Sequence, residues 1–378
     1  MNDFALAFFT RWQTRALIIG AVATIISLVG LFINRAQFFH SYLFAWIFWS
    51  GIAFGALVTV MMHALTGGDW GRAVHNVSIA AFRTLPLMAL LFIPILLGLR
   101  DIFPWARGDN GEVPGYHHKA EYLNAPFFTV RAVVYFAVVI VFAIFWRNSA
   151  IRGERDKVAA ISAGGLIAYV LCMNFASTDW VMSLDPVWYS TVFVEIFASG
   201  HFLSALAFTT ALVAWLARND DSLGAAIPRN AFYGLGNLLL SFVIFWTYVS
   251  FSQLLIIWSG NLPKEISWYL ERRSGGWQWL AVVLFAVQFL IPFLLLLSRS
   301  AKEHAQKLFW IALLIFLANL VADFWQIAPS FHPDHFYLHW LDITLPIALG
   351  GIWVACFFHY AKEQPVLPNE WLEAKQNG

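Results

Sequence analysis

Three carboxylates stand in or beside long apolar stretches of this sequence: Asp179, Glu195 and Asp323. An ionisable side chain at mid-bilayer costs roughly 2.5–3.5 kcal/mol on insertion scales, so each is a candidate functional residue until a structural partner explains it. Carboxylates in such places can take up and release protons or line a quinone site. Proton transfer is therefore the first chemistry that these residues suggest.

Asp179 and Asp185 belong to a polar, aromatic hairpin, residues 178–190 (TDWVMSLDPVWYS), between two apolar runs. Asp185 followed by Pro186 predicts a helix start, with the aspartate as N-cap and the proline at the first position. Capping would explain Asp185, which otherwise is a candidate for a quinone or polar site, but it leaves Asp179 unexplained. The aromatic residues suit the interfacial belt of a membrane: Trp180, Trp188 and Tyr189.

The span that follows the hairpin carries two more candidates, Glu195 and His201. We expect Glu195 about two turns into this helix, in a proton-transfer or quinone-site role or else paired to a cation such as Arg83. His201 points about 120° away and so has different neighbours, either as a buried core residue or in proton transfer. His63, near the inner end of the second span, is either interfacial or a further proton-transfer candidate.

Polar residues recur at helical spacing on two later spans: Asn319, Asp323 and Gln326, and Asn237, Ser241, Tyr248 and Ser252. Gln253 lies on the opposite face to Tyr248, and both are quinone-site or polar-site candidates. Such stripes could conduct protons through ordered water, or form interhelical hydrogen bonds worth about 1 kcal/mol each. Arg83 is a further proton-transfer candidate and the natural kind of partner for Asp323, a carboxylate that would not be tolerated facing lipid.

The composition identifies a polytopic membrane protein: 60% of the residues are hydrophobic, 17% aromatic and 12% charged. The formal net charge of +1 leaves no electrostatic footprint for nucleic acid. The two cysteines, Cys172 and Cys356, both fall in apolar runs, which excludes a disulfide framework, a Cys-ligated iron–sulfur cluster and covalent haem attachment. The chain therefore attaches no redox centre through sulfur.

Ten apolar runs are long enough, at about 18–25 residues, to cross a bilayer as helices. We expect them at 16–33, 41–64, 79–99, 128–146, 158–176, 189–216, 232–257, 277–297, 308–327 and 340–360. The first is too long for a signal peptide and lacks a cleavage site, so we expect it to remain a span. Lys and Arg are more frequent in the connections on the N-terminal side, which predicts cytoplasmic termini. The hairpin 178–190 and the loops 100–127 and 328–339 then lie on the outer side.

An internal repeat relates residues 48–57 (FWSGIAFGAL) to 197–206 (FASGHFLSAL). It suggests two four-helix units, spans two to five (about 41–176) and six to nine (about 189–327), flanked by spans one and ten. An even number of spans per unit makes the repeats parallel. Gly51 with Gly55, and Gly200 with Ser204, give each unit a close-packing motif. We expect a single membrane domain over 1–378, with an exposed tail over 361–378.

Histidine spacing gives little support for a haem or a metal site. Haem b needs two axial histidines at similar depth, whereas His63 is predicted on the inner side and His201 in the outer half. His332, His335 and His339 have spacings that a metal could use, but no carboxylate or Cys frame accompanies them. No phosphate-binding loop or hydrolase motif occurs. We expect no metal and no cofactor bound by this chain alone.

Four segments carry a resemblance to a known family: the hairpin 178–190, residues 251–261 (FSQLLIIWSGN), residues 268–270 (WYL) and residues 292–299 (PFLLLLSR). Together they resemble the smaller, ActF-type of the two NrfD/PsrC-like membrane subunits of alternative complex III, a bacterial quinol:cytochrome c or quinol:oxidase electron-transfer complex. The resemblance spans most of the chain. It implies ten spans in two four-helix bundles, located in the bacterial plasma membrane.

The resemblance also implies partners and a role. The partners are a larger NrfD-like subunit, an iron–sulfur protein, haem c subunits and in some complexes a terminal oxidase, so iron–sulfur clusters and haem c reside outside this chain. Quinol oxidation belongs rather to the larger subunit, and the smaller one is more often assigned to proton transfer, with quinone binding also proposed. The candidates carried over are Asp179, Asp185, Glu195, His201, Gln253 and Asp323.

Two other functions remain as alternatives to a subunit that is not catalytic alone. A proton-coupled secondary transporter would bind its substrate between the repeats and would favour matched broken helices. Pro86, Pro94, Pro292 and Pro346 do not form such a matched pattern. The second alternative is a haem b membrane anchor.

Overall fold

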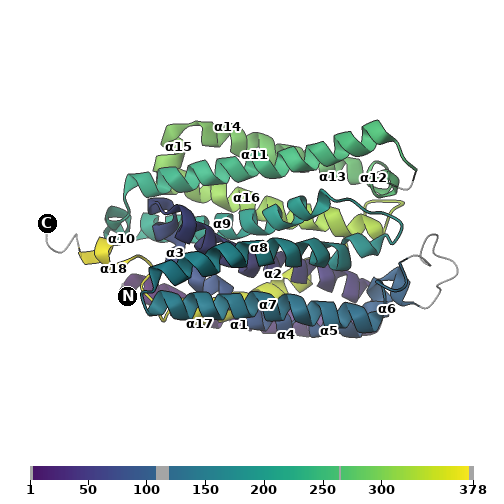
Figure 1. The fold of residues 1–378 in the computed structure, drawn as a ribbon, viewed down its shortest axis with the longest axis horizontal. Coiled ribbons are helices and arrows are strands. Elements are labelled where there is room, and N and C mark those ends of the chain that lie inside the picture. Colours follow the sequence, from purple (N-terminus) through teal and green to yellow (C-terminus); the bar gives the residue numbers. More distant parts are fainter. Residues whose placement is uncertain (1–2, 108–118, 264, 374–378) are drawn as a thin grey trace.

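The computed structural model describes residues 3–107, 119–263 and 265–373. Within these ranges the chain is helical without β-strands, and ten helices or helix groups are long and apolar enough to cross a membrane. The long helices run side by side along the length of the molecule (Figure 1). The predicted all-α, ten-span architecture is therefore confirmed. Residues 108–118 of the expected loop and 374–378 of the expected tail lie outside the described residues.

The spanning units are α1 (Asp3–Ile33), α2 (Arg35–Thr66), the group α3 (Asp69–Phe82), α4 (Leu85–Leu90) and α5 (Ile93–Leu97), α7 (Ala125–Ile151), α8 (Arg155–Trp180), α9 (Phe193–Asn219), α11 (Arg229–Gly260), the group α13 (Trp277–Leu284), η4 (Phe285–Leu290) and α14 (Ile291–Leu297), α16 (Ala305–Ile327) and α17 (Leu341–Ala361). Shorter elements connect or follow them: α6 (Leu99–Ile102), α10 (Asp221–Ala226), α12 (Ser267–Arg272), α15 (Arg299–Glu303), α18 (Asn369–Glu373) and the 3₁₀ turns Pro104–Ala106, Met182–Leu184 and Ala328–Ser330. The first span starts at Asp3, well before the predicted residue 16.

The third span is broken twice, each time just before a proline. Pro86 and Pro94 stand in the first turns of α4 and α5, where the missing N–H costs no helical hydrogen bond. Backbone carbonyls left free in a membrane need donors. Trp46 donates its indole N–H to the Met88 carbonyl at 3.0 Å, and Tyr42 donates its hydroxyl to the Leu91 carbonyl at 2.8 Å. Two aromatic side chains of α2 therefore stabilise the broken span.

The eighth span contains a π-helical turn, η4, directly before α14, which carries Pro292 in its first turn. Proline cannot donate to the carbonyl four residues earlier, and a wider turn is one way in which a helix accommodates this loss. Gln288 lies in that turn with its side chain fully buried. Single π turns are frequent at functional sites.

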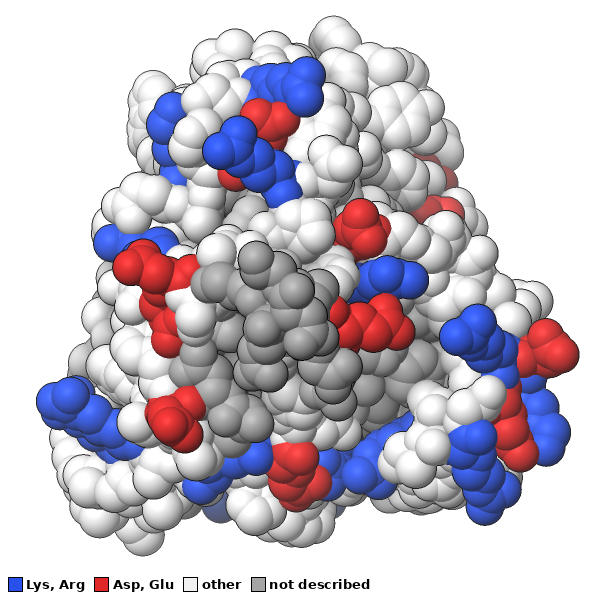
Figure 2. All heavy atoms as spheres, turned by 90° about the vertical axis from the view of Figure 1, so that its left-hand side faces the viewer, with Lys and Arg blue, Asp and Glu red and all other residues white. Residues whose placement is uncertain are grey.

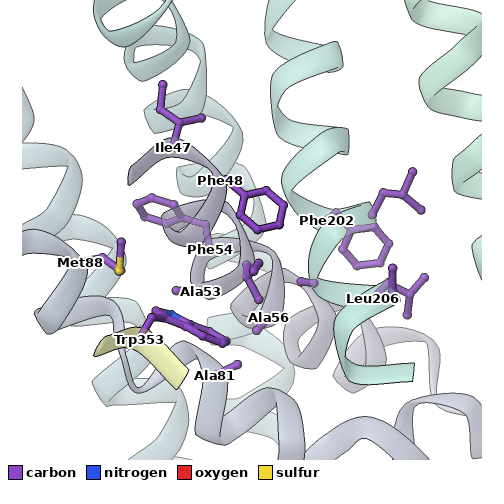
Figure 3. Packing of buried hydrophobic residues seen from close by; sticks show 14 of the residues in the cluster. Ile47, Phe48, Ala53, Phe54, Ala56, Ala81, Met88, Phe202, Leu206 and Trp353 are labelled. Carbon is purple, nitrogen blue, oxygen red and sulfur yellow. The ribbon is translucent and has the colours of Figure 1, made fainter. Parts of the chain in front are cut away.

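Helices α2 and α9 form the centre of the bundle. In the most apolar stretch of each helix, 89% of the residues of α2 and 78% of those of α9 are buried. These shares are larger than in any other described span. Phe48 of α2 projects toward Phe202 of α9, with Leu206 one turn further along (Figure 3). Helix α2 also contacts α3, α8 and α17, so it joins elements from both predicted repeats and the last span.

The remaining contacts arrange the outer helices. Helix α7 packs on α8, whereas α9 and η4 both contact α11 and α16. The first and last spans pack on each other through glycines: a Cβ on Gly20 would lie 2.9 Å from the Gly351 Cα. This backbone contact explains why two glycines stand in otherwise apolar helices.

The two ends of the bundle differ in what they carry. The start of α1 and the end of α17 lie at one end, here called the terminal end (Figure 1). Both Lys or Arg and Asp or Glu side chains are seen there (Figure 2). Hydrogen bonds tie residues 119–124, 181–192, 261–277 and 331–340 together at the opposite end, here called the loop end. At the terminal end Val366 and Leu367 are buried, so this part of the predicted tail is not exposed.

Candidate functional site

Asp323 is an intramembrane carboxylate for which the described residues provide no ion-pair partner. It lies four residues before the end of α16, partly buried inside the bundle. Among the described residues, no Lys, Arg or His forms an ion pair with it. Its predicted partner, Arg83, contacts other residues. A membrane-embedded carboxylate without a counter-charge is expensive and marks a candidate site.

The polar stripe around Asp323 does not form the interhelical bonds that were one expectation. Asn319 donates its side-chain amide to the Ile315 carbonyl at 2.9 Å, and Gln326 donates to the Ala322 carbonyl at 3.4 Å. Both bonds stay within α16. On α11, Ser241 likewise bonds to its own helix at the Asn237 carbonyl. The Asn237 side-chain oxygen, by contrast, accepts from the Lys302 ammonium of α15 at 2.7 Å, which is an interhelical bond of the expected kind. Helical spacing predicted a shared face but could not show that short polar side chains would bond backward along the same helix.

A large apolar cavity lies beside this part of α16. It has a volume of about 460 Å³ and is lined by residues of α11, α13, η4 and α16. Trp325, two residues after Asp323, lines it together with Phe285, Phe289 and the candidate Tyr248. The Tyr248 side chain is 65% exposed, so its hydroxyl is accessible from the surface of α11.

Gln253 lines a second, smaller cavity of about 160 Å³ at the loop end. Tyr189 and Glu265 line the same space. Gln253 is 1% exposed, and neither atom of its amide has a hydrogen-bond partner among the described residues. The same is true of Gln288 in η4. Buried amides without partners indicate sites for water or a polar ligand.

Asp179 has a full set of partners, so the structure does not leave it free as a proton carrier. The Arg131 guanidinium donates to both its carboxylate oxygens at 2.8 Å, and the Tyr135 hydroxyl donates a third bond at 2.8 Å. Arg131 also lies 3.8 Å from the centre of the Tyr122 ring. Arg131 stands near the start of α7 and Asp179 near the end of α8. Opposite charges at similar depth on consecutive helices were the signal that could have predicted this pair.

The predicted roles of the hairpin residues need two corrections. Asp185 does not begin a helix: α9 begins at Phe193, and Asp185 instead accepts from the Val187 N–H at 3.0 Å and from the Ser267 hydroxyl at 2.8 Å. Trp180 and Trp188 are 0% and 1% exposed, so they pack inside the protein rather than in an interfacial belt. Trp188 stacks on Trp268, with ring centres 5.1 Å apart. Aromatic residues near a span end therefore did not distinguish membrane contact from protein contact.

Glu195 is in the first turn of α9 and exposed, not two turns into the span. The helix begins later than predicted because the hairpin continues as irregular chain through Val192. The alternative expectation, that Glu195 pairs with Arg83, is wrong. Arg83 donates to the Glu363 carboxylate at 2.6 Å and lies over the Tyr360 ring.

His201 is buried at the crossing of α2 and α9. Its ring lies 4.2 Å from the centre of Phe197, and a Cβ on Gly51 would come within 2.5 Å of it. Neither ring nitrogen has a hydrogen-bond partner among the described residues. The two glycines of the α2 motif thus provide the space for this histidine and its backbone.

His63 lies elsewhere, near the end of α2. It hydrogen-bonds to the Gly68 carbonyl at 3.1 Å and faces His75 and Trp70 rather than His201. The described residues contain no group of three or more His, Cys, Asp or Glu side chains that could hold a metal ion.

Sequence reasoning missed a hydrogen-bonded network at the loop end. Asp342, in the first turn of α17, accepts from the Ser41 hydroxyl at 2.5 Å and from the His339 N–H at 2.8 Å. Gln37 bonds to Ser41 at 3.0 Å and accepts from His332 at 3.0 Å. Burial lowers the pKa of His332, which favours the neutral form of this loop histidine. The sequence pattern that could have indicated this network is the spacing of Gln37 and Ser41, which places them one turn apart on α2.

A second missed feature is the pair Glu271 and Arg272 of α12, also at the loop end. Arg272 is 2% exposed, lies 3.6 Å from the Trp268 ring centre and donates to the Gln326 carbonyl at 2.7 Å. Glu271 lies 3.3 Å from the guanidinium. Burial raises the pKa of Glu271 to about 7. Its carboxyl group therefore titrates near neutral pH.

No protein-family model matches this chain, and no curated protein matches it. The arrangement of the site residues is therefore the basis on which a function is proposed.

Proposed function

We propose that this chain is an integral membrane subunit of a bacterial respiratory or photosynthetic electron-transfer complex that oxidises quinol and passes electrons to cytochrome c or an oxidase. It contributes to quinol-linked proton transfer and to assembly, and it holds no redox centre of its own. The observation that carries the proposal is Asp323, an intramembrane carboxylate with no ion-pair partner in the described parts of the chain. Such a group can exchange a proton when the local field changes.

The segments that resemble an ActF-type NrfD-like subunit support the proposal by their arrangement. Trp188 of the hairpin stacks on Trp268 of the WYL segment, and Tyr189 shares a cavity with Gln253 of the FSQ segment. Three stretches far apart in sequence thus meet at the loop end. The proposed partners are a larger NrfD-like subunit, an iron–sulfur protein, haem c subunits and in some complexes a terminal oxidase. Both termini are proposed to be cytoplasmic, which makes the loop end the outer end.

The residues of the site have distinct proposed roles. Asp323 takes up and releases the proton. Asp342, with Ser41, Gln37 and His332, offers a hydrogen-bonded set of proton-exchanging groups at the loop end. The cavity beside Trp325 offers a lipophilic molecule such as a quinol access to the bundle from the membrane. Asp179 stabilises the fold rather than carrying protons.

The proposal is tested by purifying the tagged chain in mild detergent from its native cells. Co-purification of haem c and iron–sulfur subunits in fixed ratio is the expected result. In the complex, Asp323→Asn should lower quinol-dependent proton release, whereas Asn319→Leu, one turn away, should leave it unchanged. A clean monomer without redox partners would refute the assembly. Unchanged proton release in Asp323→Asn would refute the role of that residue.

A further inference from the structure

A basic groove lies at the terminal end, between the third spanning unit and α7. It has a volume of about 150 Å³. Two arginines, Arg83 and Arg147, share this space. The other lining residues are mostly apolar: Phe82, Leu85, Pro86, Ile140, Ala143, Ile144 and Asn148. The groove is separate from Asp323 and from both cavities of the candidate site.

The groove exists because the third span breaks there. Helix α3 ends at Phe82, Arg83 caps it, and α4 restarts at Leu85 with Pro86 in its first turn. The Thr84 hydroxyl donates to the Ala81 carbonyl at 2.6 Å, which satisfies one backbone group at the break. The interruption leaves space against α7, and Arg147, four residues before the end of α7, enters the same space.

The charges in the groove are not balanced. Glu363 accepts a hydrogen bond from Arg83 at 2.6 Å, and this bond lowers the pKa of Glu363. His359 approaches the same carboxylate at 4.0 Å, but its side chain is 61% exposed. One carboxylate therefore faces two guanidinium groups. The Nε of Arg147 is buried and has no hydrogen-bond partner among the described residues.

The walls of the groove suit a hydrocarbon chain. Of the lining residues, Leu85 is fully buried, whereas Ile144 on α7 is 52% exposed. The lining thus changes from cationic to apolar within one groove. Basic pockets between membrane helices that are bordered by apolar side chains bind lipid headgroups, and a guanidinium forms strong paired bonds to phosphate oxygens.

We propose that this groove binds an anionic phospholipid, with the phosphate held by Arg147 and Arg83 and an acyl chain lying along α7 beside Ile144. A free phosphate ion shares the headgroup chemistry, but it would gain nothing from the apolar wall. The lipid belongs to the leaflet at the terminal end. This inference does not depend on the electron-transfer function.

The test measures lipid binding to the full chain in mild detergent by native mass spectrometry, with phosphatidylglycerol and phosphatidylcholine as probes. Arg147→Gln should weaken phosphatidylglycerol binding about tenfold or more, because a charge-assisted contact is lost, and should leave phosphatidylcholine binding unchanged. Glu363→Gln should strengthen phosphatidylglycerol binding, because it removes the competing carboxylate. Arg152→Gln is the matched control, since Arg152 is an exposed arginine at the same end of α7 that does not line the groove.

Three outcomes would overturn the proposal. One is equal loss of binding in Arg152→Gln and Arg147→Gln, which would mean a general surface charge effect. Another is unchanged binding in both Arg147→Gln and Glu363→Gln. The third is competition by inorganic phosphate as effective as that by the lipid, which would leave no role for the apolar wall. Equal melting temperatures of the Arg147→Gln variant and the unmodified chain in lipid-free detergent show that its folding is intact. If the Arg147→Gln variant unfolds, the proposal stands or falls with the increase in phosphatidylglycerol binding that is expected for Glu363→Gln.

Discussion

Arg131 holds Asp179 by two parallel hydrogen bonds of 2.8 Å at the loop end of the bundle. The Tyr135 hydroxyl fills a further acceptor position on Asp179, and the Tyr122 carbonyl accepts from the remaining arm of Arg131 at 2.8 Å. The pair joins α7 to α8 where both helices leave the predicted membrane region. A carboxylate with this set of donors has a structural role, in contrast to Asp323.

Removing one member of this pair should destabilise the protein strongly. Asp179→Asn leaves Arg131 buried without its counter-charge, and breaking a buried ion pair in this way costs about 3–5 kcal/mol. We expect a clear fall in the midpoint of thermal or denaturant unfolding in detergent. The double variant Asp179→Asn with Arg131→Met should recover much of the loss. A single variant as stable as the unmodified protein would contradict the structural role.

Asp323→Asn should have the opposite effect on stability. No cation loses its partner, and the amide is cheaper to hold in the membrane than a carboxylate. The unfolding midpoint should therefore stay the same or rise under the conditions in which Asp179→Asn lowers it. A fall as large as that of Asp179→Asn would mean that Asp323 has a stabilising partner. This stability measurement is independent of the proton-release assay.

The crossing of α2 and α9 should tolerate no side chain at Gly55. A Cβ there would lie 2.2 Å from the His201 carbonyl oxygen, which belongs to the backbone and cannot move aside cheaply. We expect Gly55→Ala to cost about 1–3 kcal/mol of unfolding free energy, as overpacking does. Gly200→Ala is the control, because the nearest atom to its Cβ is Trp246 Nε1 at 3.5 Å. Equal losses in the two variants would show that the crossing is looser than described.

The contrast between Gly55 and Gly200 also shows how far the sequence predicts the fold. The length and composition of the apolar runs were sufficient to predict the number of spans, because a helix must be long and apolar enough to cross the bilayer. The small-residue motif predicted a close crossing at Gly51 and Gly55. It did not reveal that a Cβ on Gly200 would make only an ordinary contact with Trp246, because spacing alone does not say which neighbour a helix face meets.

The candidate site was less predictable, since charge pairing depends on which helices lie side by side. Arg83 pairs with Glu363 and not with Asp323 or Glu195, across a separation in sequence that no local pattern reveals. Arg131 was the partner of Asp179, and the Asp342 network joins the start of α2 to the start of α17. Asp323 was recognised because an isolated carboxylate in an apolar run is visible from sequence alone.

Glu271 should make the stability of the protein depend on pH near neutrality. Burial raises its pKa from the ordinary 4.5 to about 7 in the folded protein, with nearby Asp185 adding to the increase and Arg272 opposing it. The folded chain then binds more protons than the unfolded chain between these values, so this group makes the unfolding free energy fall as pH rises from about 4.5 to about 7. Glu271→Gln should remove that part of the pH dependence when unfolding midpoints are compared across this range. Glu303→Gln is the control. The hydrogen bond from Arg299 lowers the pKa of Glu303, so Glu303 makes the unfolding free energy rise with pH, and its removal should change the pH profile in the opposite direction. Identical pH profiles for the Glu271→Gln variant and the unmodified protein would show that Glu271 titrates alike in the folded and unfolded chains.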